Sequence, residues 1–139
     1  FTALAFAREM SQSERKRVRD FFSQVGAVIE VPEKKFDIFT ATYSSSHGYH
    51  ALAALSNAGQ ALGLDRKTAL AAAAHALAGG VMAFTEGKLP LKKLMQEAAT
   101  PGGIAAQVIK TMDHAGYYRI IERGVRAGVA RARANARRI

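Results

Sequence analysis

The sequence contains no cysteine and no long uninterrupted apolar run. The absence of cysteine excludes disulfides, thiolate metal sites and thiol catalysis. The longest apolar stretches, 69–74 and 76–84, are interrupted by His75, Gly79 and Gly80 and are rich in alanine. They are too short to span a bilayer, so we predict a soluble, cytoplasmic protein without a membrane partner.

The front of the chain also lacks the features of an intact N-terminus. It begins at Phe1 without methionine and shows no signal pattern of basic, apolar and small residues. We therefore expect a truncated or processed chain.

The size and composition of the chain, 139 residues of which 49% are hydrophobic, suit one globular domain. The formal charge of +9, from 20 basic and 11 acidic residues, would attract anionic cofactors, nucleic acid or acidic membranes. The charge alone does not indicate which of these binds.

The first 35 residues have the pattern of a strand, a helix and a second strand. The apolar runs 2–7 and 27–31 predict the two strands. Between them, Ser11 or Ser13 can cap a helix, and Glu14 is placed for a capping box. This order is that of a β-α-β crossover, which needs a larger parallel sheet for its stability.

From Phe36 onward the pattern is helical and is punctuated by glycine and proline. We expect helices, in chain order, at residues 45–62, 65–84, 91–98, 104–114 and 117–137. The alanine-rich second helix has little side-chain volume, so it can pack closely against a neighbour. Composition alone leaves two arrangements open, an interdigitated homodimer and a monomeric bundle.

Two local motifs carry a resemblance to a known family. The first is Phe36-Asp-Ile-Phe-Thr-Ala-Thr-Tyr-Ser-Ser-Ser-His-Gly-Tyr49, and the second is Ala99-Thr-Pro-Gly-Gly103 followed by a helix. Together with the closing segment Met112-Asp-His-Ala-Gly-Tyr-Tyr-Arg119, their order and spacing resemble the pyrroline-5-carboxylate reductase family. The resemblance extends over nearly the whole chain.

The resemblance implies a mainly α fold. Residues 1–35 would end a nucleotide-binding α/β domain as a short β-α-β remnant of a Rossmann-like sheet. Residues 36–139 would form the helical dimerisation and substrate domain, an interlocking helix bundle. The implied activity is NAD(P)H-dependent reduction of a small carboxylated cyclic imine in proline biosynthesis, by a homodimer or a higher oligomer.

The cofactor implied by the family is NADP or NAD. The Gly-x-Gly-x-x-Gly fingerprint of a dinucleotide site does not occur in the sequence. We therefore expect the cofactor to be bound mainly by an N-terminal domain that is missing here, and the fragment alone to be inactive.

Two loops form the candidate substrate site. The serine run and the Pro-Gly-Gly turn each open a helix, where free backbone N–H groups and the helix dipole attract an anion. The resemblance implies that they hold the substrate carboxylate. The substrate-binding candidates are Thr40, Ser44, Ser45, Ser46, Thr100, Gly102 and Gly103. Without the family, N-capping serines and a plain interhelical turn are the favoured explanations.

The chain departs from the family pattern at both loops. In the first loop only Ser45 and Tyr49 match the pattern directly, and the family threonine expected to donate a hydrogen bond at the imine nitrogen falls on Ala105. Alanine cannot donate a hydrogen bond from its side chain. We therefore hypothesise that His47, which replaces the family proline, is the catalytic donor. A divergent member with another substrate is the alternative.

Two further patterns have a simpler explanation. His47 and His50 are three residues apart, but no third ligand accompanies them, so we predict no metal site. The tail carries many arginines against a single Glu122, which would suit a basic nucleic-acid-binding helix. Apolar residues recur on its other side at helical spacing, which favours a dimer helix instead. The arginines are Arg119, Arg123, Arg126, Arg131, Arg133, Arg137 and Arg138.

Overall fold

The computed structural model describes residues 1–137; Arg138 and Ile139 of the predicted basic tail lie outside the described residues. The chain divides into two compact units. One combines Phe1–Tyr43 with Ile121–Ile139, and the other is Ser44–Ile120. The predicted domain boundary after residue 35 stays a prediction.

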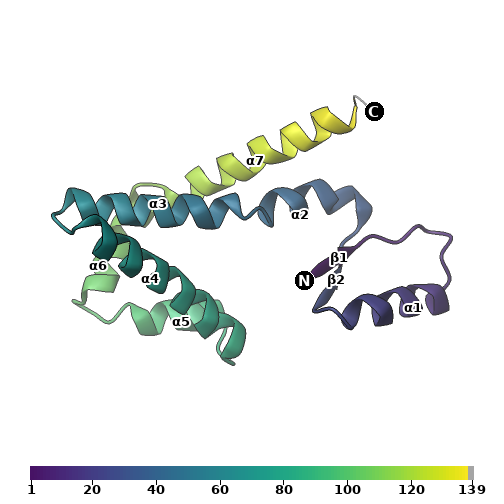
Figure 1. Cartoon of the computed structure of the whole chain (residues 1–139), viewed down its shortest axis with the longest axis horizontal. Helices are drawn as coiled ribbons and strands as arrows, with labels where there is room; N and C mark the ends of the chain where they lie inside the picture. Colours follow the sequence, from purple (N-terminus) through teal and green to yellow (C-terminus); the bar gives the residue numbers. More distant parts are fainter. Residues whose placement is uncertain (138–139) are drawn as a thin grey trace. The chain divides into compact units, whose positions relative to one another are not determined.

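The first unit begins with a small parallel sheet. Strand β1 (Thr2–Leu4) pairs in parallel with β2 (Val28–Glu30), and helix α1 (Gln12–Ser23) connects them (Figure 1). The strands are shorter than the predicted runs 2–7 and 27–31. After β1 the chain leaves the sheet and makes a loop, where the Arg15 guanidinium binds the carbonyl of residue 7 at 2.8 Å.

Helix α1 begins where the sequence predicts it. The Ser11 hydroxyl accepts a hydrogen bond from the backbone N–H of Glu14, and the Glu14 carboxylate accepts one from the Ser11 backbone at 2.8 Å. This capping box satisfies two of the N–H groups that a helix start leaves unpaired. The Ser11 hydroxyl also donates to the Glu14 carboxylate at 2.6 Å, and this bond, followed by that from the Ser11 backbone N–H, lowers the pKa of Glu14.

The last part of α7 (Tyr117–Ala136) lies on α2 (Phe36–Thr42), which follows a 3₁₀ turn, η1 (Glu33–Lys35). A Cβ built on Gly128 would lie 3.2 Å from the Cβ of Ala41, so the glycine permits a close approach of the two helices. Nearby, Arg133 forms an ion pair with Asp37 at 3.5 Å. These contacts join residues about ninety positions apart in the sequence.

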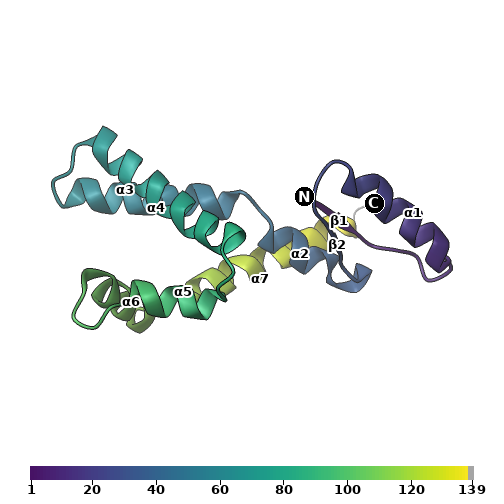
Figure 2. The same ribbon diagram turned by 90° about the horizontal axis from the view of Figure 1, so that it is seen from below.

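The second unit is built on a helical hairpin of α3 (Ser46–Ala61) and α4 (Arg66–Glu86), which lie side by side (Figure 2). The turn between them needs Gly63, whose φ of 105° is in the left-handed region. Asp65 then caps α4 by accepting from the N–H groups of Lys67 and Thr68. Both helices lie within two residues of their predicted limits.

The hairpin buries very little. Among the described residues, only Ala69, Ala73 and Ser56 are classed as buried. Meanwhile Leu70, Val81 and Phe84 of α4 remain 45%, 62% and 50% exposed. Three small side chains do not make the core that a domain of this size requires, so most of the apolar surface of α4 is unpartnered in a single chain.

Helix α4 joins the two apolar runs, 69–74 and 76–84, into one longer helix. Each run alone was predicted to be too short to span a membrane. The helix continues through Gly79 and Gly80 to Glu86 and is, by length and composition alone, apolar enough to cross a membrane. Core helices of soluble proteins have the same property, so this is weak evidence for a membrane span. Beyond α4, the short helix α5 (Leu91–Ala98) contacts it, and α6 (Ile104–His114) precedes α7.

Candidate functional site

The serine run lies at the start of α3 and is exposed. The Ser44 and Ser46 hydroxyls are 2.7 Å apart, and Ser44 Oγ also accepts a hydrogen bond from the Ser46 backbone at 3.4 Å. Ser45 occupies the N-cap position but makes no capping hydrogen bond with its side chain. Ser45 therefore does not cap α3, whereas Ser44 accepts from a backbone N–H at the helix start, and the loop presents hydroxyls beside the first turn of a helix.

His47 lies in that first turn and is half-buried. Its backbone N–H donates to the Ser44 carbonyl at 3.1 Å, which fixes it next to the serine run. Thr40 is on α2 and is exposed, but it belongs to the other compact unit. The structure therefore groups His47 with the three serines and leaves the role of Thr40 a prediction.

The Thr100–Gly103 segment is a tight turn that opens α6. The Gly103 N–H donates to the Thr100 carbonyl at 2.9 Å, and Gly102 has a φ of 77°, the pattern of a type II turn with proline in the second position. A Cβ on Gly103 would come within 2.5 Å of Thr100 Oγ1. Both glycines are therefore required by the geometry of this turn.

A hollow of about 600 Å³ extends from this turn along α6, and we call it the α6 groove. Its lining residues are Gly102, Gly103, Ile104, Gln107, Val108, Thr111 and Met112. Ile104 is 88% exposed and Val108 is half exposed, so the wall of the groove is apolar and open. Ala105, at the position of the missing threonine, does not line it.

Gln107 and Thr111 are the functional candidates that the sequence analysis missed. Gln107 Nε2 lies 3.4 Å from Thr111 Oγ1, and that hydroxyl donates to the Gln107 carbonyl at 2.9 Å. The signal was present in the spacing, since positions 103, 107 and 111 recur every four residues and so share one face of a helix.

The two candidate loops do not meet within one chain. The serine run stands at the N-terminus of α3, and the Thr100–Gly103 turn at the N-terminus of α6. In both views they lie at different ends of the helical unit (Figures 1 and 2). The expectation that both helix starts converge on one carboxylate is therefore not met by a single copy.

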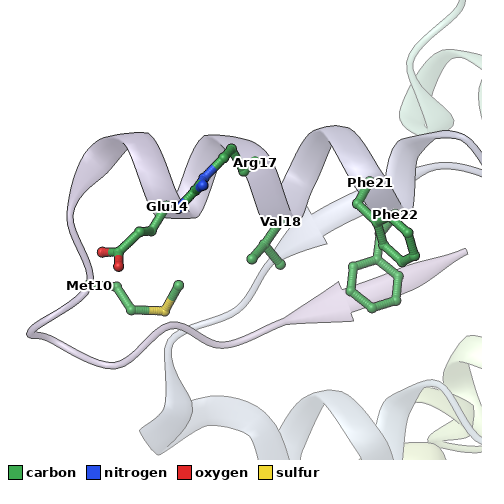
Figure 3. A pocket seen from close by; sticks show the side chains of 6 residues that line it. All are labelled: Met10, Glu14, Arg17, Val18, Phe21 and Phe22. Atoms are coloured by element: carbon green, nitrogen blue, oxygen red, sulfur yellow. The ribbon is translucent and has the colours of Figure 1, made fainter.

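A second hollow, of about 420 Å³, lies along α1 (Figure 3). Its lining residues are Met10, Glu14, Arg17, Val18, Phe21 and Phe22. Phe21 and Phe22 meet edge to face with their ring centroids 5.3 Å apart, and Glu14 is already engaged in the capping box. None of the predicted site residues lies here.

Part of the basic tail is engaged in ion pairs. Arg126 donates to Glu122 at 2.5 Å, one turn earlier on α7, while Arg133 pairs with Asp37. Among residues 1–137, no three His, Asp or Glu side chains are grouped so that they could hold a metal ion. His47 and His50 remain neighbours on one helix without a third ligand from the described part of the chain.

The model for pyrroline-5-carboxylate reductase dimerisation matches residues 33–135. The chain belongs to this family. The pyrroline-5-carboxylate reductase of Thermus thermophilus is 34% identical over 91% of this chain and 51% of its own length. That of Mycobacterium tuberculosis is 29% identical over 94% of this chain and 51% of its own length. The chain thus spans about half the length of these curated reductases.

Solved structures of the reductase family have the same fold. A Coxiella burnetii pyrroline-5-carboxylate reductase superposes with a TM-score of 0.84 over 95% of this chain and 50% of its own, at 23% identity. A Plasmodium falciparum pyrroline carboxylate reductase with NADP bound gives 0.76 over 95% of this chain and 56% of its own, also at 23% identity. The predicted family and mainly α fold are confirmed, and the alternative of a nucleic-acid-binding module is not favoured.

Proposed function

We propose that this chain is the helical dimerisation and substrate half of a nicotinamide-dependent reductase that acts on pyrroline-5-carboxylate. The observation that carries the proposal is the family match over residues 33–135, which includes both candidate loops. The two relatives named pyrroline-5-carboxylate reductase align with 91% and 94% of this chain, at 34% and 29% identity. The Thr100–Gly103 turn, with its two required glycines, supplies a backbone that a carboxylate can approach closely.

The proposed partner is a second copy of the chain. Among the described residues, a single copy buries only three small side chains and leaves Leu70, Val81 and Phe84 exposed on α4. Covering such a face is the ordinary way for a thin helical domain to complete its core. A homodimer also offers a solution for the separated loops, since the serine run of one copy can meet the Thr100–Gly103 turn of its partner. Assembly into a higher oligomer and a cytoplasmic location remain predictions.

The proposed cofactor is NADP, supported by the NADP-bound relative, with NAD as the alternative. When bound, the nicotinamide supplies a hydride. The residues of this chain do not fit the pyrophosphate of a dinucleotide, because no Gly-x-Gly-x-x-Gly loop is present. We assign cofactor binding to another part of the whole protein, and this chain to binding and orienting the substrate.

The test is an assay of the whole protein for NADPH oxidation with pyrroline-5-carboxylate, with NADH in parallel. Turnover would support the reductase proposal and would mean that the absence of a threonine at Ala105 is compensated. Cofactor binding without turnover of this imine would contradict the proposed substrate, and a panel of other carboxylated cyclic imines would then identify the divergent alternative.

A further inference from the structure

The α6 groove begins at the turn to which the proposed function assigns the substrate carboxylate. Its lining includes Gly102 and Gly103 at the turn, and the apolar side chains of Ile104, Val108 and Met112 along α6. A small ring with one carboxylate matches this surface, because the charged end can meet backbone N–H groups while the ring meets apolar side chains. What such a substrate still requires is a polar group for its ring nitrogen.

Only two side chains that line the groove carry hydrogen-bonding groups. The hydroxyl proton of Thr111 is used within α6, since it donates to the Gln107 carbonyl at 2.9 Å. The carboxamide of Gln107 makes a single hydrogen bond among the described residues, from Nε2 to Thr111 Oγ1 at 3.4 Å. That distance is at the long limit of a hydrogen bond, so it holds the carboxamide weakly.

The position of Gln107 suits a ligand on the turn. It lies one helical turn after Gly103, an advance of about 6 Å along the axis. Long side chains on a helix lean toward its N-terminus, so a change of rotamer would bring the carboxamide toward the Thr100–Gly103 turn. Ala105, by contrast, has no donor and does not line the groove.

We propose that Gln107 positions the substrate by pairing its carboxamide with the ring nitrogen of a carboxylated cyclic imine whose carboxylate lies on the Thr100–Gly103 turn. This inference rests on the proposed function and names a residue for its site. An amide pairs with either form of that nitrogen, because Oε1 accepts from a protonated iminium and Nε2 donates to a neutral imine. Gln107 does not exchange a proton, so it acts by orientation.

The experiment compares Gln107→Met with a matched Gln96→Met in the whole protein. Gln96 is an exposed glutamine on α5 that does not line the groove. Gln107→Met keeps the length of the side chain and removes one neutral hydrogen bond, so the KM for pyrroline-5-carboxylate should rise roughly 3- to 10-fold. The pH profile of kcat should not move, because an amide does not titrate. Gln96→Met should leave both unchanged.

A near-isosteric second variant guards against a folding defect. Gln107→Glu keeps an acceptor for a protonated ring nitrogen, which Gln107→Met removes, so its KM should rise less than that of Gln107→Met. Binding of L-proline, the reduced form of that imine, measured by calorimetry gives a readout independent of turnover. Its dissociation constant should rise in Gln107→Met, and it should not rise in Gln107→Glu, which pairs with the ammonium of proline, or in Gln96→Met.

The outcomes separate this inference from the proposed function. If the wild type turns over the imine and Gln107→Met has the same KM and the same affinity for proline, the role of Gln107 is overturned and the reductase proposal is supported. Wild-type protein that binds proline in a Gln107-dependent way but reduces no imine would support the role and refute the reductase. Protein that binds no proline and reduces no cyclic imine would overturn both.

Discussion

Single side chains at the helix starts decide where the helices of this chain begin, and Asp65 is the clearest case. Its carboxylate accepts from the N–H groups of Lys67 and Thr68 at 3.0 and 3.1 Å. Hydrogen bonding from Thr68 is the main cause of the lowered pKa of Asp65. Because the folded pKa lies below its unfolded value, this group stabilises the fold above the unfolded pKa and loses that effect as pH falls through the folded one.

We therefore expect Asp65→Ala to lower the melting temperature at pH 6 by roughly 2–5 °C, the range of a lost N-cap. The difference from wild type should shrink at pH 3. Asp65→Asn is the control, since asparagine caps nearly as well without titrating. Thermal unfolding followed by circular dichroism measures all three. An equal loss for Asp65→Ala at both pH values would contradict the assignment.

At the same scale, His47 is the residue proposed as hydrogen-bond and proton donor. It is fixed beside the serine run by its backbone contact with Ser44. If it donates the proton, His47→Ala should lower kcat about 100-fold. His50→Ala, one turn later and exposed, is the matched control and should leave kcat unchanged. Steady-state kinetics of the whole protein from pH 5 to 9 is the measurement.

These kinetics also distinguish His47 from Gln107. Loss of a proton donor lowers kcat, whereas loss of a positioning amide raises KM and leaves kcat nearly unchanged. Unaltered turnover in His47→Ala would remove the histidine from the mechanism. The two candidates thus have separate signatures in one set of assays.

At the scale of the element, the exposed face of α4 is the feature that calls for a partner. Leu70, Leu77, Val81 and Phe84 recur at intervals of seven, four and three residues, which places them on one side of the helix. The buried residues of α4 are Ala69 and Ala73. Ala73 lies one turn before the half-buried Leu77, so the stripe borders on the intrachain contact, and its exposed part is Leu70, Val81 and Phe84.

Placing a charge in that stripe should break the proposed homodimer. We expect Val81→Lys to raise the dimer dissociation constant at least 10-fold, because it removes apolar burial and leaves a lysine without a counter-charge. Ala72→Lys is the control, since Ala72 is exposed on the opposite side of α4. Sedimentation velocity across a concentration series reports the result. Equal dimerisation in both variants would place the interface elsewhere.

At the scale of the whole molecule, we propose that this chain dimerises and that another part of the protein binds the cofactor, and this assignment can be tested directly. The isolated chain should dimerise, since the family match to a dimerisation domain lies within it. It should not bind NADPH, because its sequence lacks the phosphate-binding loop. Titration followed by NADPH fluorescence should show binding to the whole protein and none to the isolated chain. Equal affinities would refute this assignment.

The sequence by itself determined the local structure and the family. The capping box of Ser11 and Glu14, the Asp65 cap and the glycine at position 63 act within one helical turn, so the residues that specify them are adjacent in the chain. The helix limits predicted from them lie within two residues of the structure. The motif spacing also indicated the reductase family, which the comparisons confirm.

Only the tertiary structure decided which of these local features meet. It ended the strands after three residues each, where their parallel pairing ends. It separated the serine run from the Thr100–Gly103 turn and placed Gln107 in the groove that starts at that turn. Such relations depend on the packing of distant helices, and periodicity fixes the face of a helix without fixing what that face contacts.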